Sequence, residues 1–567
     1  MIISNPSHMV LLSLFFSVLL IVLYFIYRYI YPKKSISYPI LILFISTMPL
    51  VSMLRSGGYE SGDLNIHVAF AIPFFENLKN GIFFPVWNQY VIGGYGYPLY
   101  LFLYPLPYYL SSFIHLFGLS FIDSFKIILV FSFILSGQGM YLLVKDVTGN
   151  KKAGFISALF YLFAPYHLID MHFRVAIGET LSFALLPFCF LYLRKMTSSF
   201  SRQNFILFAS FLSLLIISHQ AIALASFPFL LIYSLFLIKR KKDLSKIIFT
   251  FLLPIGITAF YWIPLLYSSR FTYLLNGRIE FSSLSSLFYS PYLFGFLFQG
   301  HSGELALIVG YLHLLVLLVF IAFLFKNKIN PVFKKFGLFL LISTLFLLFM
   351  ITPASESVWK NIFLLKGFQF SYRLLVLVNL FTSILAGLTL VNIQNKIFVK
   401  FLLMIVVFSS ILNWGNRKAL SSVNDETIRK SLYSSLDSVG QGKTVWNNVK
   451  LKKRTDNINI IKGDTTINEI SRKQTNHKYF INVISNEALL TDNTTYFPGW
   501  NINADSINLP INNKNGLINF KLKKGDHSVS VYYKETRINR IARVFSFTVI
   551  IFMILIVSFS RKKKILK

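Results

Sequence analysis

Long apolar runs recur along most of this chain, and they limit its possible folds more than any other feature. The sequence is 55% hydrophobic and only 14% charged, with a mean hydropathy of +0.62. A chain of 567 residues with this balance cannot cover a water-soluble surface, and its runs reach the length that crosses a bilayer. We therefore predict an all-α polytopic membrane protein with about 13 spans, near residues 10–30, 38–54, 126–146, 153–170, 178–193, 204–218, 221–238, 246–267, 304–325, 336–352, 371–391, 397–413 and 543–560.

Basic residues give the predicted spans an orientation. The net charge of +33 would suggest nucleic acid as the partner of a soluble protein, but here many basic residues fall in clusters between apolar runs. We expect no nucleic-acid partner, and we place these clusters in the cytoplasm of a multi-pass inner- or plasma-membrane protein. The clusters are 33–34, 151–152, 194–195, 239–242, 326–335, 396–400 and 561–564. The first span lacks a small-residue cleavage site before Lys33, so we expect it to be retained.

The first extracytoplasmic loop, residues 55–125, contains a further apolar stretch at 99–118. Counting it as a span would move Lys151 and Lys152 outside and invert every later cluster, and it carries Pro98, Pro105 and Pro107. We predict a helix that lies along the outer membrane surface. The alternative is an ordinary transmembrane helix that breaks the charge rule.

Composition changes after Trp414, where the chain becomes polar. Residues 478–484, 501–504, 516–522 and 527–533 have the pattern of short strands, and 523–526 that of a turn. We therefore divide the chain into a transmembrane domain (1–413), an extracytoplasmic small β-sandwich (414–540) and a final span with a basic tail (541–567). Cys189 is the only cysteine, so no internal disulfide can form.

Asp63 is the first candidate for chemistry, because the predicted topology places it just outside the membrane. Glu60 lies nearby, and His67 would share a helix face with Asp63 if the segment after Gly62 is helical. The carboxylate could then accept a proton from a hydroxyl group or help to hold a divalent cation such as Mg or Mn, with Asp63 and His67 as possible ligands. Alternatively, Asp63 caps the following helix and His67 is a satisfied polar residue.

Arg174 and Glu179 lie in a short predicted outer loop, with Asp170 and His172 as lesser candidates. A guanidinium group is a planar fork that suits phosphate oxygens, and Glu179 could be a second catalytic acid. The alternative is an Arg–Glu ion pair that only closes the loop.

Arg373 begins a later span on the same side, where it could bind phosphate or reach the interface as an ordinary snorkelling residue. His219 and His301 also fall outside and could line the same cavity as substrate-binding residues, whereas we expect His313 to be packed and hydrogen-bonded to a neighbouring helix.

Several blocks of sequence resemble known families. The segments 61–67, 97–100, 105–107, 161–166 and 174–179 resemble bacterial membrane proteins labelled as pyruvoyl-tetrahydropterin-synthase-related, and 496–500 with 525–527 resemble the outer β domain of YfhO-type proteins. Both groups are similar to the GT-C glycosyltransferases. This resemblance implies an enzyme that takes a sugar from a polyprenyl-phosphate donor on the outer face. It also implies an acidic residue in the first outer loop and a phosphate-contacting arginine late in the chain, which are Asp63 and Arg373 here.

The chemistry of such a donor fits the candidate residues. A lipid-linked sugar keeps its phosphate at headgroup depth, so an enzyme that uses it needs cations and an acid at the membrane edge. We predict that Asp63 activates a hydroxyl of a cell-envelope glycan or lipid acceptor while Arg174 and Arg373 hold the departing polyprenyl phosphate. The alternative is a transporter or flippase of lipid-linked glycans, which predicts charged residues near mid-membrane and matching inverted halves.

Overall fold

A computed structural model describes residues 6–198, 201–238, 244–273, 307–415, 419–420, 422–432, 444–447 and 454–565 of the chain. The chain divides into two compact units. The first comprises Met1–Ile66, Tyr109–Ile255 and Arg278–Asn424, and the second comprises His67–Tyr108, Gly256–Gly277 and Asp425–Lys567. The predicted site at 300–304, including His301, lies outside the described residues.

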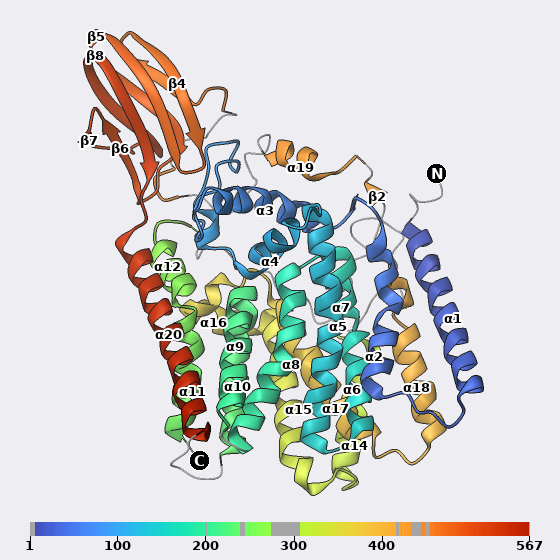
Figure 1. Cartoon of the computed structure of the whole chain (residues 1–567). Helices are drawn as coiled ribbons and strands as arrows, with labels where there is room; N and C mark the ends of the chain where they lie inside the picture. The colour runs from blue at the N-terminus through green and yellow to red at the C-terminus, as the bar shows by residue number, and fades with distance from the viewer. Residues whose placement is uncertain are drawn as a thin grey trace. The chain divides into compact units, whose positions relative to one another are not determined.

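Helices make up most of the first unit (Figure 1). In chain order they are α1 (Pro6–Ile30), α2 (Tyr38–Ser46), α5 (Phe121–Thr148), α6 (Lys151–Leu162), α7 (Pro165–Ile169), α8 (Ile177–Ser198), α9 (Arg202–Ser218), α10 (Gln220–Leu237), α11 (Leu244–Ile257), α14 (Tyr311–Phe325), α15 (Pro331–Ile351), α16 (Glu356–Asn361), α17 (Leu375–Leu390) and α18 (Lys396–Phe408). Three described helices run from one unit into the other along the chain: α3 (Leu64–Lys79), α4 (Leu106–His115) and α11, whose last two residues belong to the second unit.

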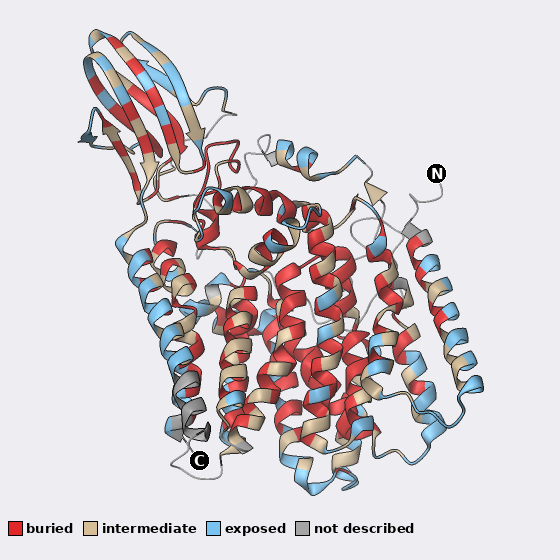
Figure 2. Cartoon of the chain, viewed as in Figure 1, coloured by how far each residue is buried: buried red, intermediate tan, exposed pale blue. Residues whose placement is uncertain are grey.

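Helix α17 forms the centre of the first unit. Every one of its residues is buried, and α6, α14 and α15 pack around it (Figure 2). Gly387 allows α6 to approach closely, because a Cβ atom there would lie 2.2 Å from Ser157 Oγ. Helix α1, in contrast, exposes much of its surface. Burial on all sides of α17 explains why its sequence is apolar without a polar face.

Seven described helices are long and apolar enough to cross a membrane, or up to nine if each bent pair is one span. All thirteen predicted segments contain helix, but the count of thirteen is not confirmed. The predicted count is higher than the seven to nine described spans because some predicted spans are broken into two helices or contain a helix that is short. A 49° bend before Pro165 separates α6 from α7, for example, and α14 has only 15 residues.

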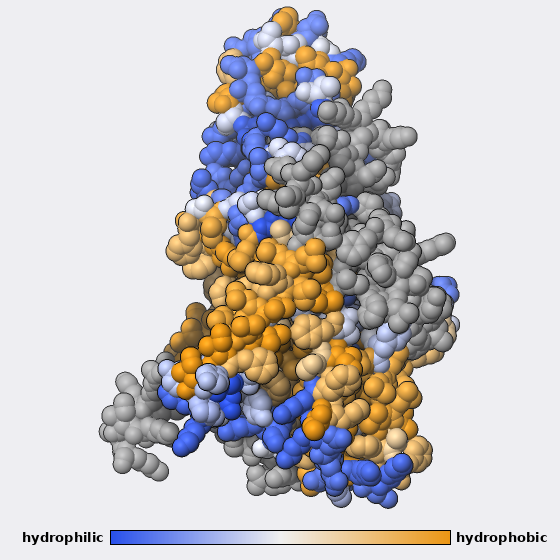
Figure 3. Space-filling view, turned by 90° about the vertical axis from the view of Figure 1, so that its right-hand side faces the viewer, coloured by the Kyte–Doolittle hydropathy of each residue, from blue (hydrophilic) through white to orange (hydrophobic). Residues whose placement is uncertain are grey.

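Exposed apolar side chains cover the outside of the described helices. On α1 and α18 they include Phe15, Phe25, Ile397 and Phe401. Figure 3 shows a broad apolar area over this side of the molecule with hydrophilic side chains below it. Lys33 and Lys34, which follow α1, are exposed. Such a surface is stable in a lipid bilayer and not in water.

The apolar stretch 99–118 does not form a spanning helix. It contains a short 3₁₀ helix at Leu99–Leu101 and the ten-residue α4. Ten helical residues extend only about 15 Å, roughly half of a bilayer core. Pro105 stands between the two pieces, in agreement with its effect on a helix interior. That α4 lies along the membrane surface stays a prediction.

The second unit contains an antiparallel sheet of six strands: β3 (Ile458–Lys462), β4 (Thr465–Lys473), β5 (Asn476–Thr495), β6 (Trp500–Ala504), β7 (Ile507–Leu509) and β8 (Leu517–Tyr533). The order is β3-β5-β8-β6-β7, and β4 also pairs with β5. The predicted β-sandwich is therefore corrected to one sheet among the described strands. It stays a single sheet because β5 and β8 pair along most of their lengths.

The predicted turn at 523–526 is also wrong. Gly525 pairs with Val483 and Asp526 with Asn482, so β8 continues through the polar stretch. The pairing shifts between Val483 and Glu487, which absorbs the irregularity as a bulge. The turn-forming residues 523–526 therefore lie within the long pairing of β5 and β8, where they accompany a bulge and the chain does not reverse its direction.

The segment 67–108 packs against this sheet. Trp87 meets Trp500 edge-on at a ring distance of 5.1 Å and stacks on Tyr533 at 6.3 Å. Gln474 donates to Glu76 Oε2 at 2.9 Å and accepts from the Gln89 amide at 3.0 Å. Helix α20 (Arg537–Ile565) follows the sheet and packs on α12 (Ala259–Ser269). The second unit therefore joins three distant parts of the sequence.

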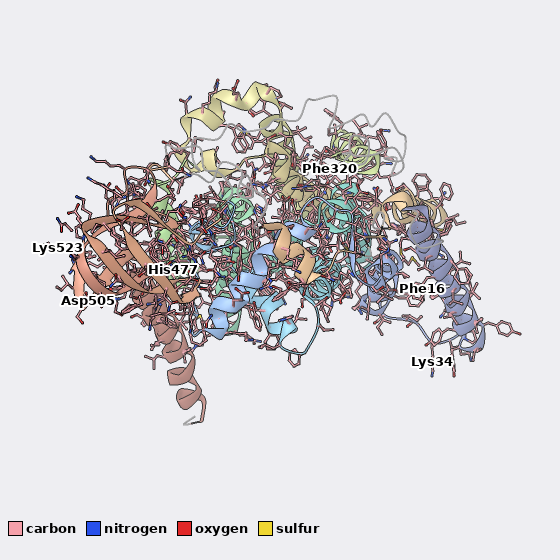
Figure 4. The ribbon with its side chains drawn as sticks, turned by 90° about the horizontal axis from the view of Figure 1, so that it is seen from above. Phe16, Lys34, Phe320, His477, Asp505 and Lys523 are labelled. Carbon is pink, nitrogen blue, oxygen red and sulfur yellow. The ribbon has the colours of Figure 1, made fainter. Side chains whose placement is uncertain are left out.

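One face of the sheet contains a buried charged network. Asp492 accepts from His477 Nδ1 at 2.9 Å, from the Tyr479 hydroxyl at 2.8 Å and from Arg472 at 3.4 Å. Figure 4 shows His477 away from Asp505 and Lys523, which lie together at one end of the sheet. The hydrogen bonds from His477, Tyr479 and Arg472 satisfy the buried carboxylate of Asp492.

Candidate functional site

The loop that presents Asp63 belongs to the first unit and is fixed at both ends. The two-residue strand β1 (Gly58–Tyr59) pairs with β2 (Ala419–Leu420). Before it, the buried ammonium of Lys126 on α5 donates to the carbonyl oxygens of Arg55 at 2.5 Å and Gly57 at 2.7 Å. The only signal for this role of Lys126 in the sequence was a basic residue inside an apolar run.

The far end of the loop is bound to the segment that carries Arg174. The Gly62 amide donates to the carbonyl of Phe173, and the Asp63 amide donates to the carbonyl of Arg174, each at 2.8 Å. A Cβ atom on Gly62 would lie 3.0 Å from that Arg174 oxygen, so the close approach favours glycine. Two segments more than a hundred residues apart are thus held in register at Asp63.

The Arg174 segment has an unusual backbone. After α7, residues Asp170–Arg174 form a π-helix, and Val175 follows with a φ of 55°. π-Helical turns and left-handed β-branched residues are uncommon, and both concentrate at functional sites. This conformation brings Asp170, Arg174 and the start of α8 together.

Arg174 forms a buried network with two carboxylates and a tyrosine. Its Nη1 donates to Asp170 Oδ1 at 2.5 Å and to the Tyr166 hydroxyl at 2.9 Å, and its Nη2 donates to Glu179 Oε1 at 3.1 Å. Tyr166 in turn donates to Glu179 Oε2 at 2.6 Å. The Arg–Glu ion pair that was the alternative reading of this loop is therefore present, and it also includes Asp170.

Arg373 joins the same network from a short 3₁₀ helix (Ser371–Leu374) that directly precedes α17. Its Nε donates to Glu179 Oε1 at 3.3 Å, Nη1 to the Phe368 carbonyl at 2.5 Å, and Nη2 to Gln369 Oε1 at 3.3 Å. Its side chain is 16% exposed, against 9% for Arg174 and 2% for Glu179. Glu179 therefore links two guanidinium groups, of which Arg373 is the more accessible.

Asp63 differs from the other carboxylates of the cluster. Its side chain is partly exposed and makes no hydrogen bond to any residue in the described part of the chain. The amide of Leu64 at the start of α3 is capped by Ser61 Oγ at 3.3 Å. Burial raises the pKa of Asp63, Arg174 and Arg373 lower it, and Glu179 raises it further, with a net increase. A carboxylate with a raised pKa and no fixed partner is suited to accept a proton.

The predicted histidines take different positions. His219 precedes α10, where its Nδ1 accepts from the Ile222 amide at 3.3 Å, and it lies near Glu179. His67 falls in the second unit, with Nδ1 2.8 Å from the Tyr108 hydroxyl. His313 on α14 lies 2.7 Å from Thr382 Oγ1 on α17. Within the described ranges, no group of three His, Cys, Asp or Glu side chains could hold a metal ion.

Two tyrosines of the cluster were not predicted. Tyr166 bridges Arg174 and Glu179, and the ring of Tyr372 lies 5.0 Å from the Arg174 guanidinium. Tyrosines are frequent in this chain, so their type alone carried little signal. Two positions were hints: Tyr372 is next to Arg373, and Tyr166 ends the segment 161–166 of the family resemblance.

These features define a polytopic membrane protein with a buried charged cluster at one end of its helices. The family model described as "6-pyruvoyl-tetrahydropterin synthase related domain; membrane protein" matches residues 100–417, which is more than half of the chain. The protein belongs to this family.

Other known proteins show weaker similarity. An uncharacterized protein of Lactococcus lactis subsp. cremoris (strain MG1363) is 27% identical over 247 residues, which cover 42% of this chain and 40% of that protein. The chain thus matches less than half the length of this relative.

Two solved structures are also similar. The arabinofuranosyltransferase AftD from Mycobacteria has a TM-score of 0.45 at 15% identity and covers 67% of this chain and 27% of its own. The Archaeoglobus fulgidus oligosaccharyltransferase has a TM-score of 0.36 at 11% identity, over 72% of this chain and 56% of its own. TM-scores of this size do not establish a common fold.

Proposed function

We propose that the protein is a membrane glycosyltransferase of the GT-C type, which transfers a sugar from a polyprenyl-phosphate donor to an extracytoplasmic acceptor in the cell envelope. The observation that carries this proposal is the convergence of Asp63, a carboxylate without a fixed partner, with two guanidinium groups that share Glu179. A base beside phosphate-binding cations is what transfer from a phosphate leaving group requires.

Arg373 is the proposed phosphate ligand. A guanidinium group has five N–H donors, and the three contacts described for Arg373 use one on each nitrogen. One N–H therefore remains on each of Nη1 and Nη2, which suits two oxygens of one phosphate. Arg174, whose terminal nitrogens face Asp170, Tyr166 and Glu179, positions this group through Glu179.

Asp63 is the proposed general base. It removes the proton from an acceptor hydroxyl, and the oxygen bonds to the anomeric carbon as the bond from that carbon to the phosphate oxygen breaks. The lipid phosphate leaves with the bonding electrons and is held by Arg373. Protonation of Asp63 removes a negative charge from the site while the phosphate gains one. A raised pKa for Asp63 favours this proton transfer.

A divalent cation is not part of this proposed sequence of steps. If Mg or Mn binds at Asp63, the described chain supplies no set of three acidic, His or Cys ligands around it. Water and substrate oxygens would then complete the coordination, as is usual for Mg²⁺.

Exposed apolar side chains in the segment before Arg373 favour a lipid as the source of the phosphate. Ile362, Phe363 and Leu364 are exposed and lie nine to eleven positions before Arg373 in the chain. A soluble phosphate donor has no use for such a surface, whereas the hydrocarbon part of a lipid does. Glu179 is assigned to positioning the arginines, since its carboxylate already has three partners.

The test uses the purified protein in liposomes with a panel of polyprenyl-phosphate sugars labelled in the sugar, and envelope extract as the acceptor. Wild-type protein should release free polyprenyl phosphate, and Asp63→Asn should abolish the release. Lys360→Gln, which alters an exposed ion pair within α16, should be unaffected. Movement of the labelled lipid across the bilayer without cleavage would support the flippase alternative and contradict the proposal.

A further inference from the structure

The turn before Arg373 has a strained backbone. The Phe370 amide donates to the Phe368 carbonyl at 2.7 Å, two residues earlier, and Gln369 between them has a φ of 65°. A γ-turn with a positive central φ is rare and costs energy for any residue other than glycine. Such strain persists only where the surrounding structure enforces it.

The surrounding structure fixes one side of this turn. The ring of Phe368 packs edge-on against Trp359 at 5.1 Å, and the Trp359 indole donates to the Met350 carbonyl at 2.9 Å. Phe368 and Trp359 are both buried. The side chain of Phe368 therefore anchors the turn to the end of α15, and its carbonyl oxygen faces Arg373.

Both of the turn's acceptors bind the terminal nitrogens of one guanidinium group. Arg373 Nη1 donates to the Phe368 carbonyl and Nη2 donates to Gln369 Oε1, while Nε donates to Glu179. The ring of Phe370, the third residue of the turn, lies 5.2 Å from the guanidinium carbon. Each nitrogen is held by one acceptor, so the plane of the fork is fixed.

We propose that Gln369 is a positioning residue for Arg373: its strained turn and its side-chain amide hold the guanidinium so that one N–H of each terminal nitrogen points to a phosphate group. This inference rests on the proposed function, because it takes a lipid phosphate as the ligand of Arg373. It adds a residue with no charge and no distinctive sequence pattern to the site.

Binding of a short isoprenyl phosphate to the full-length protein in detergent, measured by calorimetry, tests this role. Gln369→Gly tolerates the turn but lacks the amide, and we expect about tenfold weaker binding, the usual effect of one hydrogen bond to a charged group. Gln369→Ala should bind more weakly still, because alanine also disfavours the positive φ. Gln369→Asn supplies an amide and tolerates this conformation, so it should recover most of the affinity.

Two controls separate positioning from general stability. Asn327 is a non-glycine residue of the first unit that has a positive φ and lies outside the cluster. Asn327→Gly should leave binding unchanged. In transfer assays the Gln369 variants should raise KM for the donor more than they lower kcat, because chemistry depends on Asp63. A merely structural role would lower the unfolding temperature in step with the affinity and would overturn the inference.

The remaining outcomes distinguish this inference from the function on which it rests. Equal binding by wild type, Gln369→Gly and Gln369→Ala would overturn the role of Gln369 and leave the proposed function intact. Failure of the wild type to bind isoprenyl phosphate would overturn both. Inorganic phosphate should bind more weakly than isoprenyl phosphate, and equal affinity for the two would overturn the lipid as ligand.

Discussion

At the scale of single residues, the three carboxyl groups of the cluster have different surroundings, and we therefore propose different roles for them. Asp170 and Glu179 are buried and ion-paired with Arg174, whereas Asp63 is partly exposed and makes no hydrogen bond to the described residues. A paired carboxylate is neutralised and holds its partners in place, and an unpaired one is available to react. The chemistry of the site therefore depends on which carboxylate lacks a partner.

Asp63→Asn should separate activity from stability. We expect transfer to fall by about 10²–10⁴-fold, the usual effect of a general base. The unfolding temperature should stay the same or rise, because the raised pKa of Asp63 shows that its charged form is disfavoured in the folded protein. The transfer rate and the unfolding temperature are measured on the same preparations of wild type and Asp63→Asn. A marked loss of stability in the variant would assign Asp63 a structural role instead.

The pH dependence of transfer should show the raised pKa of Asp63. A base acts only when it is ionised, so kcat/KM should decline as the pH falls through that pKa, at a higher pH than for an ordinary carboxylate. Arg373→Gln removes a positive charge that lowers this pKa and should move the acidic limb to higher pH. The residual activity of that variant, measured over the same pH range, provides the comparison.

At the scale of elements, the loop before Asp63 depends on one lysine of α5. Lys126→Met keeps most of the length of the side chain but removes the ammonium group that donates to the carbonyls of Arg55 and Gly57. We expect a loss of about 2–4 kcal/mol of stability, because two hydrogen bonds from a charged donor are lost, one to a buried residue and one to a half-buried residue. Thermal unfolding in detergent measures this loss. The exposed Lys360→Gln serves as the matched control and should change stability by less than about 1 kcal/mol.

The sheet should lose stability at acidic pH because of Asp492. Burial alone would raise the pKa of this carboxyl, but its contacts with His477 and Arg472 lower it well below the usual range. A lowered pKa contributes stability above the ordinary value of about 3.9 and loses it as the pH falls further. Asp492→Asn should destabilise the protein at neutral pH and flatten this acid dependence. Circular dichroism against pH would show it, and an unchanged profile would contradict the assignment.

At the scale of the whole molecule, residues that are far apart in the sequence build each unit. The second unit combines His67–Tyr108 and Gly256–Gly277 with Asp425–Lys567, and Trp87 and Trp500 lie in contact within it. Loss of one ring should weaken the attachment of the whole 67–108 segment. The fold of this segment therefore requires the chain that follows it by several hundred residues.

A double-mutant cycle measures this coupling. Trp87→Ala and Trp500→Ala should each destabilise the protein by about 3–5 kcal/mol, and their combination by less than the sum, with a coupling of about 0.5–1.5 kcal/mol. Each variant should also make 67–108 more sensitive to protease. Exactly additive effects on unfolding, with unchanged protease sensitivity, would show that the two rings act independently.

The sequence by itself determined the membrane class, the positions of the apolar segments, parts of the strands β5, β6 and β8, and the identities of Asp63, Arg174, Glu179 and Arg373 as candidates. These follow from local properties, since apolar length and residue type are read within a short window. The same local signals misread 523–526 as a turn and the sheet as a sandwich, because strand pairing over long β5 and β8 outweighed them.

Only the tertiary structure decided which candidate is free to react and which is neutralised. Glu179 meets Arg373 across 194 positions of sequence, and Asp63 is held against Arg174 by backbone hydrogen bonds that no residue type signals. The charge state and accessibility of a carboxylate depend on the groups that the rest of the chain brings within a few ångströms of it. That proximity is a property of packing, and a sequence window contains no information about it.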